Sequence, residues 1–393
     1  MAVILLILGL ILFIGLVVVH EFGHFVEARR GGVEVEEFGI GFPPRAWKKR
    51  IKSPKGHFNF TLNWLPLGGF VKLKGENDED KRPGSFGAAP LGTKVKIMLA
   101  GVVMNLLTAL VLFMIVGLIG MPQLPKELLP NQFTVKGNEH VVKDVDNKGV
   151  LLVGQVIKDT PASRADLKND DEIISIDGQP IDSHEDLASL TRSKPASNVS
   201  VVIKRNDQLL TKEVKLNSTE LAKTQGYLGV QTRSGQSGMK FVRYTWAAPI
   251  VAVGTTKQLT EVTFKGLGKA LKGLGSIFAG LFTGNQAARQ DGHERATKDI
   301  GGPLAIFFVL RDGSELGIAF VLFIIALISL TLAIMNVLPI PALDGGRLFV
   351  TLLFRAARKP LHQKTEELIH GSGFAILMIL FVLITIVDVR RFF

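Results

Sequence analysis

The chain has 393 residues, 47% of them hydrophobic, and a formal net charge of +11 at pH 7. This composition favours a membrane protein with room for two or three domains. The chain has no cysteine, which excludes disulfides, thiolate nucleophiles and thiolate metal ligands, so any transition metal must bind nitrogen and oxygen atoms. The basic residues are spread widely and often flank apolar segments, which fits a lipid surface better than a nucleic acid.

Four uncharged stretches are long enough to cross a bilayer, which takes about 20 helical residues. The first has its basic residues after it rather than before it, the wrong polarity for a cleaved signal peptide, so we expect a retained helix. The resulting division of the chain is a first span (1–28), a loop (29–96), a second span (97–121), an inserted domain (122–235), an amphipathic region (236–315), a third span (316–346), a second loop (347–370) and a fourth span (371–388).

Basic residues concentrate in the two loops, 29–96 and 347–370, which the positive-inside rule places in the cytoplasm. Both termini and the inserted domain then lie on the opposite side of the membrane. Arg390 and Arg391 oppose this orientation, but the first loop carries many more basic residues.

The first loop contains an apolar pattern of period two, which predicts a strand over residues 58–64. A turn at 65–69 and a second alternating segment complete a predicted hairpin of about residues 57–74. A hairpin lying on lipid fits this pattern, and so does an edge strand that receives an extended peptide.

The inserted domain shows a β-rich pattern between residues 149 and 230. Thr160-Pro161 marks a helix start, Asp177-Gly178 marks a hairpin turn, and residues 198–207 and 209–216 have the pattern of a strand pair. From residue 241 to 296 the chain reads as amphipathic helices with spaced lysines, which suit a membrane surface.

The first span ends in the sequence HEFGH, which contains His20, Glu21 and His24. Two histidines four residues apart project from one helix face and can bind one zinc ion, with the glutamate close to its water. The alternative is that they only cap the interfacial end of the helix. Because ionisable groups within a span are costly, the position favours a metal site.

A zinc site needs a third protein ligand, and Asp344 is the candidate. It follows the third uncharged stretch, at the cytoplasmic end in the predicted topology, and His20 lies at that same end, roughly 28 Å along its helix. Pro339 and Pro341 should break the third helix, and the glycine pair after Asp344 allows a turn. An interfacial aspartate in a helix-ending turn is the alternative.

The HExxH pair, the motif NVLPIPALDG at residues 336–345 and the inserted domain together resemble the site-2 protease family, and in particular the bacterial regulator-of-sigma-E group of intramembrane zinc metalloproteases. The resemblance implies zinc bound by His20, His24 and Asp344, with Glu21 as catalytic base. It implies that Asn336, Pro339 and Pro341 act on the substrate helix. It also implies that Gly68, Gly69 and Phe70 belong to a membrane-associated β-loop that pairs with the substrate, and it matches the run from Asp299 to the family's glycine-proline segment.

The inserted domain resembles a single, circularly permuted PDZ domain, where some members of the family have two. Its carboxylate-binding loop would be Gly226, Tyr227, Leu228, Gly229 and Val230. The resemblance further implies single-span substrates such as anti-sigma factors or remnant signal peptides. It implies a bacterial cytoplasmic membrane, with the PDZ domain outside and the active site near the cytoplasm.

Three other classes are weaker. A catalytically dead scaffold has no need of matched metal ligands, and a prenyl-protein protease takes a glutamate as third ligand and lacks the inserted domain. A metal transporter would place ligands on several helices, whereas the remaining histidines fall in predicted loops or flanks and are expected at the surface: His57, His140, His184, His293, His362 and His370.

Overall fold

The computed structural model describes residues 1–54, 56–124, 129, 131–144, 151–181, 183–205, 208–234, 239–283 and 303–392. The chain forms two compact units, one of residues 1–121, 132–140 and 243–393, the other of 122–131 and 141–242. The first four residues of the predicted glycine-proline segment lie outside the described residues.

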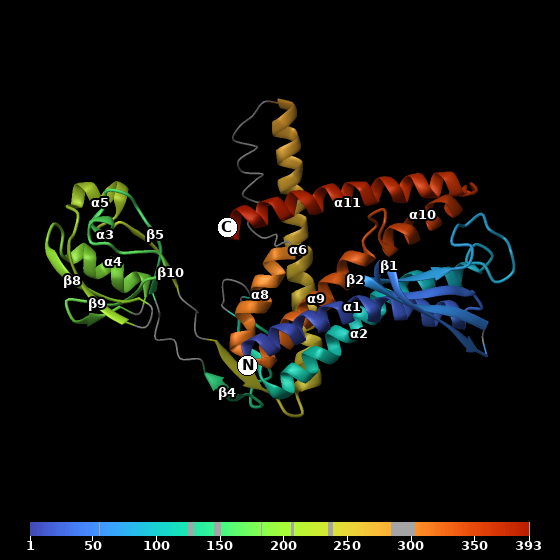
Figure 1. Cartoon of the computed structure of the whole chain (residues 1–393), viewed down its shortest axis with the longest axis horizontal. Helices are drawn as coiled ribbons and strands as arrows, with labels where there is room; N and C mark the ends of the chain where they lie inside the picture. The colour runs from blue at the N-terminus through green and yellow to red at the C-terminus, as the bar shows by residue number, and fades with distance from the viewer. Residues whose placement is uncertain are drawn as a thin grey trace. The chain divides into compact units, whose positions relative to one another are not determined.

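Four helices of the described chain are long and apolar enough to cross a membrane: α1 (Ala2–Arg30), α2 (Leu91–Ile119), α9 (Ile318–Val337) and α11 (Gln363–Phe392), the last over 363–386. They correspond to the four predicted spans. Within the first unit, α2 packs against both α1 and α9 (Figure 1). A Cβ atom added to Gly23 of α1 would lie 2.6 Å from the backbone oxygen of Ala100 on α2, so a glycine is needed where these two helices touch.

The predicted third span is divided into two helices. Helix α9 ends at Val337, and α10 (Asp344–Ala356) begins at the candidate ligand. The prolines at 339 and 341 cannot donate backbone hydrogen bonds, which accounts for the break. Helix α10 extends to Ala356 and α11 begins at Gln363, so most of the predicted second loop is helical.

A charged cluster attaches the segment before α2 to α10 and α11. Lys94, which is buried, pairs with Asp78, whose backbone N–H donates to Glu366 at 3.1 Å. Arg347 of α10 lies 3.7 Å from the Glu366 carboxylate and donates to the backbone oxygen of Glu76. These contacts fix the start of α10 against the bundle.

The amphipathic region contains the 36-residue helix α6 (Ala248–Thr283), and α8 (Pro303–Leu316) follows. The first turns of α6 bury Val251, Thr255 and Leu259, and the helix packs against α2 and α9. The first turns of α6 are therefore integrated into the helical unit, and the lysines that were expected to face a membrane surface, such as Lys257 and Lys265, are exposed.

The predicted hairpin is wrong in its pairing. Strands β1 (Val35–Ser53) and β2 (Gly56–Leu73) are antiparallel, and residues 35–40 of β1 pair with 69–73 on one side and with 59–62 on the other. The tight turn lies between Ser53 and Gly56, where residues 45–53 pair with 56–63. The segments expected to pair with each other are thus separated by a strand from an earlier part of the chain. Such a long-range pairing leaves no trace in a period-two pattern.

The second unit is built on an antiparallel sheet of order β10-β5-β6-β8-β9, with β7 paired to β6. Its elements are β5 (Leu151–Val156), α3 (Pro161–Arg164), β6 (Glu172–Ile176), β7 (Gln179–Pro180), α4 (His184–Ser193), β8 (Asn198–Arg205), β9 (Gln208–Lys215), α5 (Thr219–Gln225) and β10 (Val230–Ser234). Alternate residues of the strands, such as Val153, Ile176 and Val201, form its core. Strands β3 (Met121–Pro122), β4 (His140–Asp144) and β11 (Lys240–Arg243) form a separate small sheet.

Local signals in this unit are confirmed. Helix α3 begins at Pro161 after Thr160, and Asp177 and Gly178 have φ angles of 48° and 77°, as a two-residue hairpin turn requires. Gly226 ends α5 with φ 71°, and residues 226–229 form the connection from α5 to β10.

Candidate metal centre

Helix α1 continues without interruption through the HExxH sequence to Arg30. His20 and His24 therefore lie one turn apart on one face. Their Nε2 atoms are 3.2 Å apart, and His20 is 8% exposed. The α1 helix thus directs two imidazole nitrogens at one point inside the helical unit.

Asp344 reaches the same point from the first residue of α10. Its Oδ2 lies 3.1 Å from Nε2 of His20 and 3.3 Å from Nε2 of His24. The two glycines that follow are sterically required: a Cβ on Gly345 would lie 2.5 Å from the Leu338 backbone oxygen, and one on Gly346 would overlap that of Ile340. The chain can therefore turn tightly after the prolines and return Asp344 toward α1.

The three donor atoms fit a tetrahedral metal ion. Zinc bonds of about 2.0–2.1 Å at tetrahedral angles separate the ligand atoms by about 3.3–3.4 Å, close to the observed distances. Asp344 Oδ2 is buried and has no hydrogen-bond partner among the described residues, although two imidazole nitrogens approach it. The convergence of these three donor atoms on one buried point is what a shared cation explains. Two nitrogens and one carboxylate oxygen form a donor set that suits zinc.

Glu21 follows His20 and leaves α1 on the side of the β1–β2 sheet. Its Cγ lies 3.5 Å from the position that a Cβ on Gly69 would occupy, and its carboxyl is approached by the backbone amide of Val71. The predicted β-loop residues Gly68, Gly69 and Phe70 thus lead into the strand segment beside Glu21. This segment has a strand partner on one side only within the described part of β1 and β2.

Helix α2 contacts both histidines on the side away from the candidate metal position, a contact that the sequence patterns did not predict. The backbone oxygen of Ile97 lies 2.7 Å from Nδ1 of His24, and the side-chain amide of Asn105 lies 3.2 Å from Nδ1 of His20. Between them, a Cβ on Gly101 would lie 2.5 Å from Nε2 of His24 and 2.6 Å from Nε2 of His20. An asparagine four residues after a glycine in an otherwise apolar span was the available signal.

The other predicted site residues lie in two places. Asn336 is on the last turn of α9, and Pro339 and Pro341 are in the connection to Asp344. The five residues 226–230 belong to the second unit, where the backbone oxygens of Tyr227, Leu228 and Gly229 all accept hydrogen bonds from neighbouring segments.

The expectation that His370 lies at the surface is wrong. It is half-buried on α11, and its Nδ1 accepts a hydrogen bond of 3.3 Å from the backbone N–H of Ala342. Ala342 has φ 78°, an unfavourable conformation for alanine, two residues before Asp344. His370 therefore supports the connection that carries the third candidate ligand.

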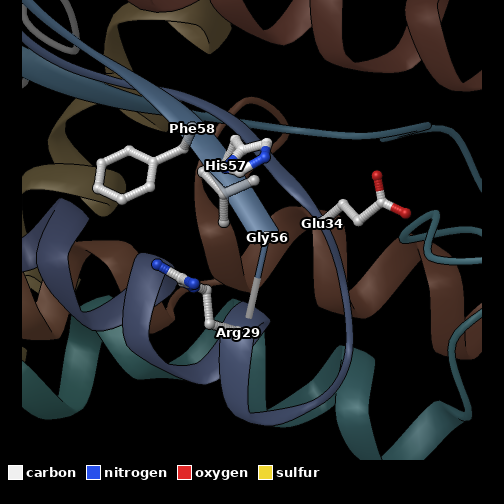
Figure 2. Close-up of a pocket in the computed structure, with 6 residues that line it drawn as sticks. Arg29, Glu34, Gly56, His57 and Phe58 are labelled. Carbon is white, nitrogen blue, oxygen red and sulfur yellow. The ribbon is translucent and has the colours of Figure 1, made fainter. Parts of the chain in front are cut away.

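A small pocket beside the end of α1 is separate from the candidate metal centre (Figure 2). Arg29 lines it with His57 and Phe58, and its guanidinium donates to Ser53 Oγ at 2.9 Å. The same guanidinium lies 5.4 Å from the ring centres of Phe25 and Phe58. These contacts attach the β1–β2 sheet to the helix that carries the HExxH sequence.

Taken together, a helical membrane unit with two histidines and an aspartate around one point, and a glutamate beside them, defines a membrane-integrated metallopeptidase. The comparisons with known proteins agree. The model of peptidase family M50 matches residues 8–380, and the chain belongs to that family.

Curated relatives match along almost their whole length. A Clostridium perfringens protein named as a candidate zinc metalloprotease is 30% identical over 98% of both chains. The zinc metalloprotease RasP of Geobacillus kaustophilus is 25% identical over 98% of this chain and 97% of its own. The regulator of sigma-E protease RseP of Salmonella typhimurium is 24% identical over 96% of both chains.

Proposed function

We propose that this protein is an intramembrane zinc endopeptidase that cleaves single-span membrane proteins in or near their membrane segments. The observation that carries the proposal is the convergence of His20, His24 and Asp344 on one point in a membrane unit, with Glu21 beside it. The names of the relatives, which include zinc metalloproteases and a sigma-E regulator protease, support the metal and the reaction class.

Within this proposal, each residue of the site has a distinct role. His20, His24 and Asp344 hold zinc, whose chemistry when bound is to lower the pKa of water to about 7 and to polarise a carbonyl. Glu21 accepts the proton that water gives up and returns it to the leaving amine. Ile97, through its backbone oxygen, holds the His24 ring by accepting from Nδ1–H.

Peptide bonds in a membrane helix are covered by side chains and hydrogen-bonded within the helix, so the substrate must unwind before hydrolysis. The 69–73 segment offers the means, because it is an outer strand whose Val71 amide approaches Glu21. An extended substrate that adds to this strand would lie along the candidate metal centre. Asn336, Pro339 and Pro341, in the connection that carries Asp344, would contact the unwound segment.

The further assignments follow the same proposal. The basic loops put the active site near the cytoplasmic side of a bacterial inner membrane, with the second unit outside. This unit would act as a PDZ domain that receives a chain terminus at residues 226–230, and so would select substrates whose outer part has already been removed. Anti-sigma factors and remnant signal peptides are the expected substrate classes.

Purified protein in detergent tests the proposal with a single-span model substrate. The wild type should cut within the span, whereas Glu21→Gln should keep about one zinc ion per chain and cut at least about 100-fold more slowly, because general base catalysis contributes roughly 10²–10⁴-fold. Equal cleavage by the two proteins would overturn the assignment of Glu21. A wild type without bound metal would overturn the zinc site.

A further inference from the structure

We infer that Asn105 is a positioning residue for the metal centre: its side-chain oxygen accepts a hydrogen bond from Nδ1–H of His20 and so presents Nε2 of that ring to the metal. The inference rests on the proposed zinc site. It adds a side chain from α2 to a metal centre whose candidate ligands come from α1 and α10.

One face of α2 lies against the two histidines of α1. Ile97, Gly101 and Asn105 are spaced four residues apart and therefore lie along one face of the helix. This face meets the two histidines of α1: Ile97 lies behind His24, Gly101 allows both rings to approach, and Asn105 lies behind His20. The two rings of the pair are thus each contacted at Nδ1 by the same neighbouring helix.

The position of the proton on each imidazole ring decides which nitrogen can bind a metal. A backbone oxygen can only accept, so the 2.7 Å contact with Ile97 requires the His24 proton on Nδ1 and leaves Nε2 free for a metal. Nε2 of His20 points at the same centre as Nε2 of His24 and Oδ2 of Asp344. A neutral His20 that binds a metal through Nε2 must also carry its proton on Nδ1.

Nδ1 of His20 faces the side-chain amide of Asn105. Asn105 Nδ2 lies 3.2 Å away, so with the metal bound two donors would face each other. Asn105 is 1% exposed, and its Oδ1 has no hydrogen-bond partner among the described residues. A half-turn of the carboxamide exchanges the two atoms with little change in packing. After this rotation Oδ1 of Asn105 accepts from Nδ1–H of His20, and two N–H groups no longer face each other.

A contact that does not involve His20 holds the backbone of Asn105 in place. Ser329 on α9 donates from Oγ to the backbone oxygen of Asn105 at 2.8 Å. The turn of α2 that carries Asn105 is therefore held by the helix that leads toward Asp344. An asparagine at this depth could instead serve only to join helices, as polar residues do in membranes, and the experiment must separate that role from the positioning of His20.

The experiment compares zinc affinity in the full-length protein in detergent, measured by competition with a chromophoric chelator. Asn105→Ala removes the acceptor and should weaken zinc binding about 10- to 100-fold, as loss of a residue that orients a metal-ligating histidine typically does. Asn105→Asp keeps an acceptor and no longer has a donor, so it should bind zinc within about threefold of the wild type. Thr108→Ala is the matched control, since it removes a hydroxyl from the same helix that donates only to the backbone oxygen of Met104 within α2, and it should leave zinc affinity unchanged.

The visible spectrum of the cobalt-substituted protein gives a second readout. Asn105→Asp should keep the absorption of the wild type, and Asn105→Ala should change it. The inference is overturned if Asn105→Ala binds zinc as tightly as the wild type, or if Asn105→Asp is as weak as Asn105→Ala while both give the wild-type elution volume in gel filtration. If an Asn105 variant elutes as an aggregate, the cobalt spectrum of the folded fraction decides in the same way. Failure of the wild type itself to bind zinc would instead refute the proposed function.

Discussion

Gly101 of α2 and His20 of α1 are so close that no side chain fits between them: a Cβ at position 101 would lie 2.6 Å from Nε2 of His20. The candidate metal centre is therefore bounded on one side by the backbone of α2. Because the glycine is inside a helix, its role is the close approach of two helices rather than an unusual backbone angle.

Replacement of Gly101 by alanine should displace the two histidines. We expect zinc affinity to fall by at least about tenfold, comparable to the loss of a group that supports a metal ligand, and cleavage to fall with it. Isothermal titration with zinc measures the effect. Gly92→Ala is the control, because it lies on the same helix and a Cβ there has no neighbour within 4 Å; if both variants bind zinc like the wild type, the close contact at Gly101 is not needed.

Replacement of Gly69 by alanine should separate catalysis from metal binding. The new Cβ would lie 3.1 Å from the Gly39 backbone oxygen and 3.5 Å from Glu21 Cγ, so the strand beside Glu21 must shift. We expect full zinc content but cleavage slower by about tenfold or more, part of the roughly 10²–10⁴-fold that a general base supplies. Gly15→Ala on α1, where a Cβ meets nothing within 4 Å, should cleave normally. Unchanged cleavage by Gly69→Ala would argue against a role for this strand.

The second unit contains a buried ion pair, and we expect its disruption to lower the stability of the unit. The Arg205 guanidinium contacts both oxygens of Asp171, at 2.6 and 2.7 Å, and the Asp171 side chain is 1% exposed. Arg205→Met leaves this carboxylate buried and unpaired, which should destabilise the unit by about 3–5 kcal/mol. Hydrogen exchange of the amides in β6 and β8 measures the change. Lys168→Met, at a 61% exposed side chain, should cost less than about 0.5 kcal/mol.

A surface ion pair in the same unit should make a small, pH-dependent contribution to the stability of the fold. The Lys194 ammonium, and then the backbone N–H of Ser200, lower the pKa of Asp177 in the folded protein. A lowered pKa stabilises the fold above the unfolded-state pKa of about 3.9, and this stabilisation is lost as the pH falls through the folded value. Asp177→Asn should therefore lower the stability by less than about 1 kcal/mol at pH 7, and the difference should vanish once the pH is well below the lowered pKa of the folded state. Thermal unfolding across pH measures it; a constant difference from pH 2 to 7 would contradict the pairing.

Local patterns predicted much of this molecule. The spans and the HExxH face follow from periodicity and hydropathy, and the prolines before Asp344 predicted where α9 ends. What could not be predicted depends on contacts between distant segments. The strand 35–40 lies between two arms of β2, and nothing within those arms reveals it. His370 was expected at the surface because it lies in the predicted second loop, yet its ring accepts a hydrogen bond from the backbone N–H of Ala342.

The most direct test of the account is the zinc content and coordination of Asp344→Asn compared with the wild type. The wild type should bind one zinc ion per chain, and X-ray absorption should show nitrogen and oxygen ligands at about 2.0–2.1 Å. Asp344→Asn should lose most of that zinc, while Asp312→Asn, at a 62% exposed aspartate, should retain it. If Asp344→Asn binds zinc with the wild-type affinity and spectrum, Asp344 is not a ligand and the metal centre assigned to these three residues is wrong.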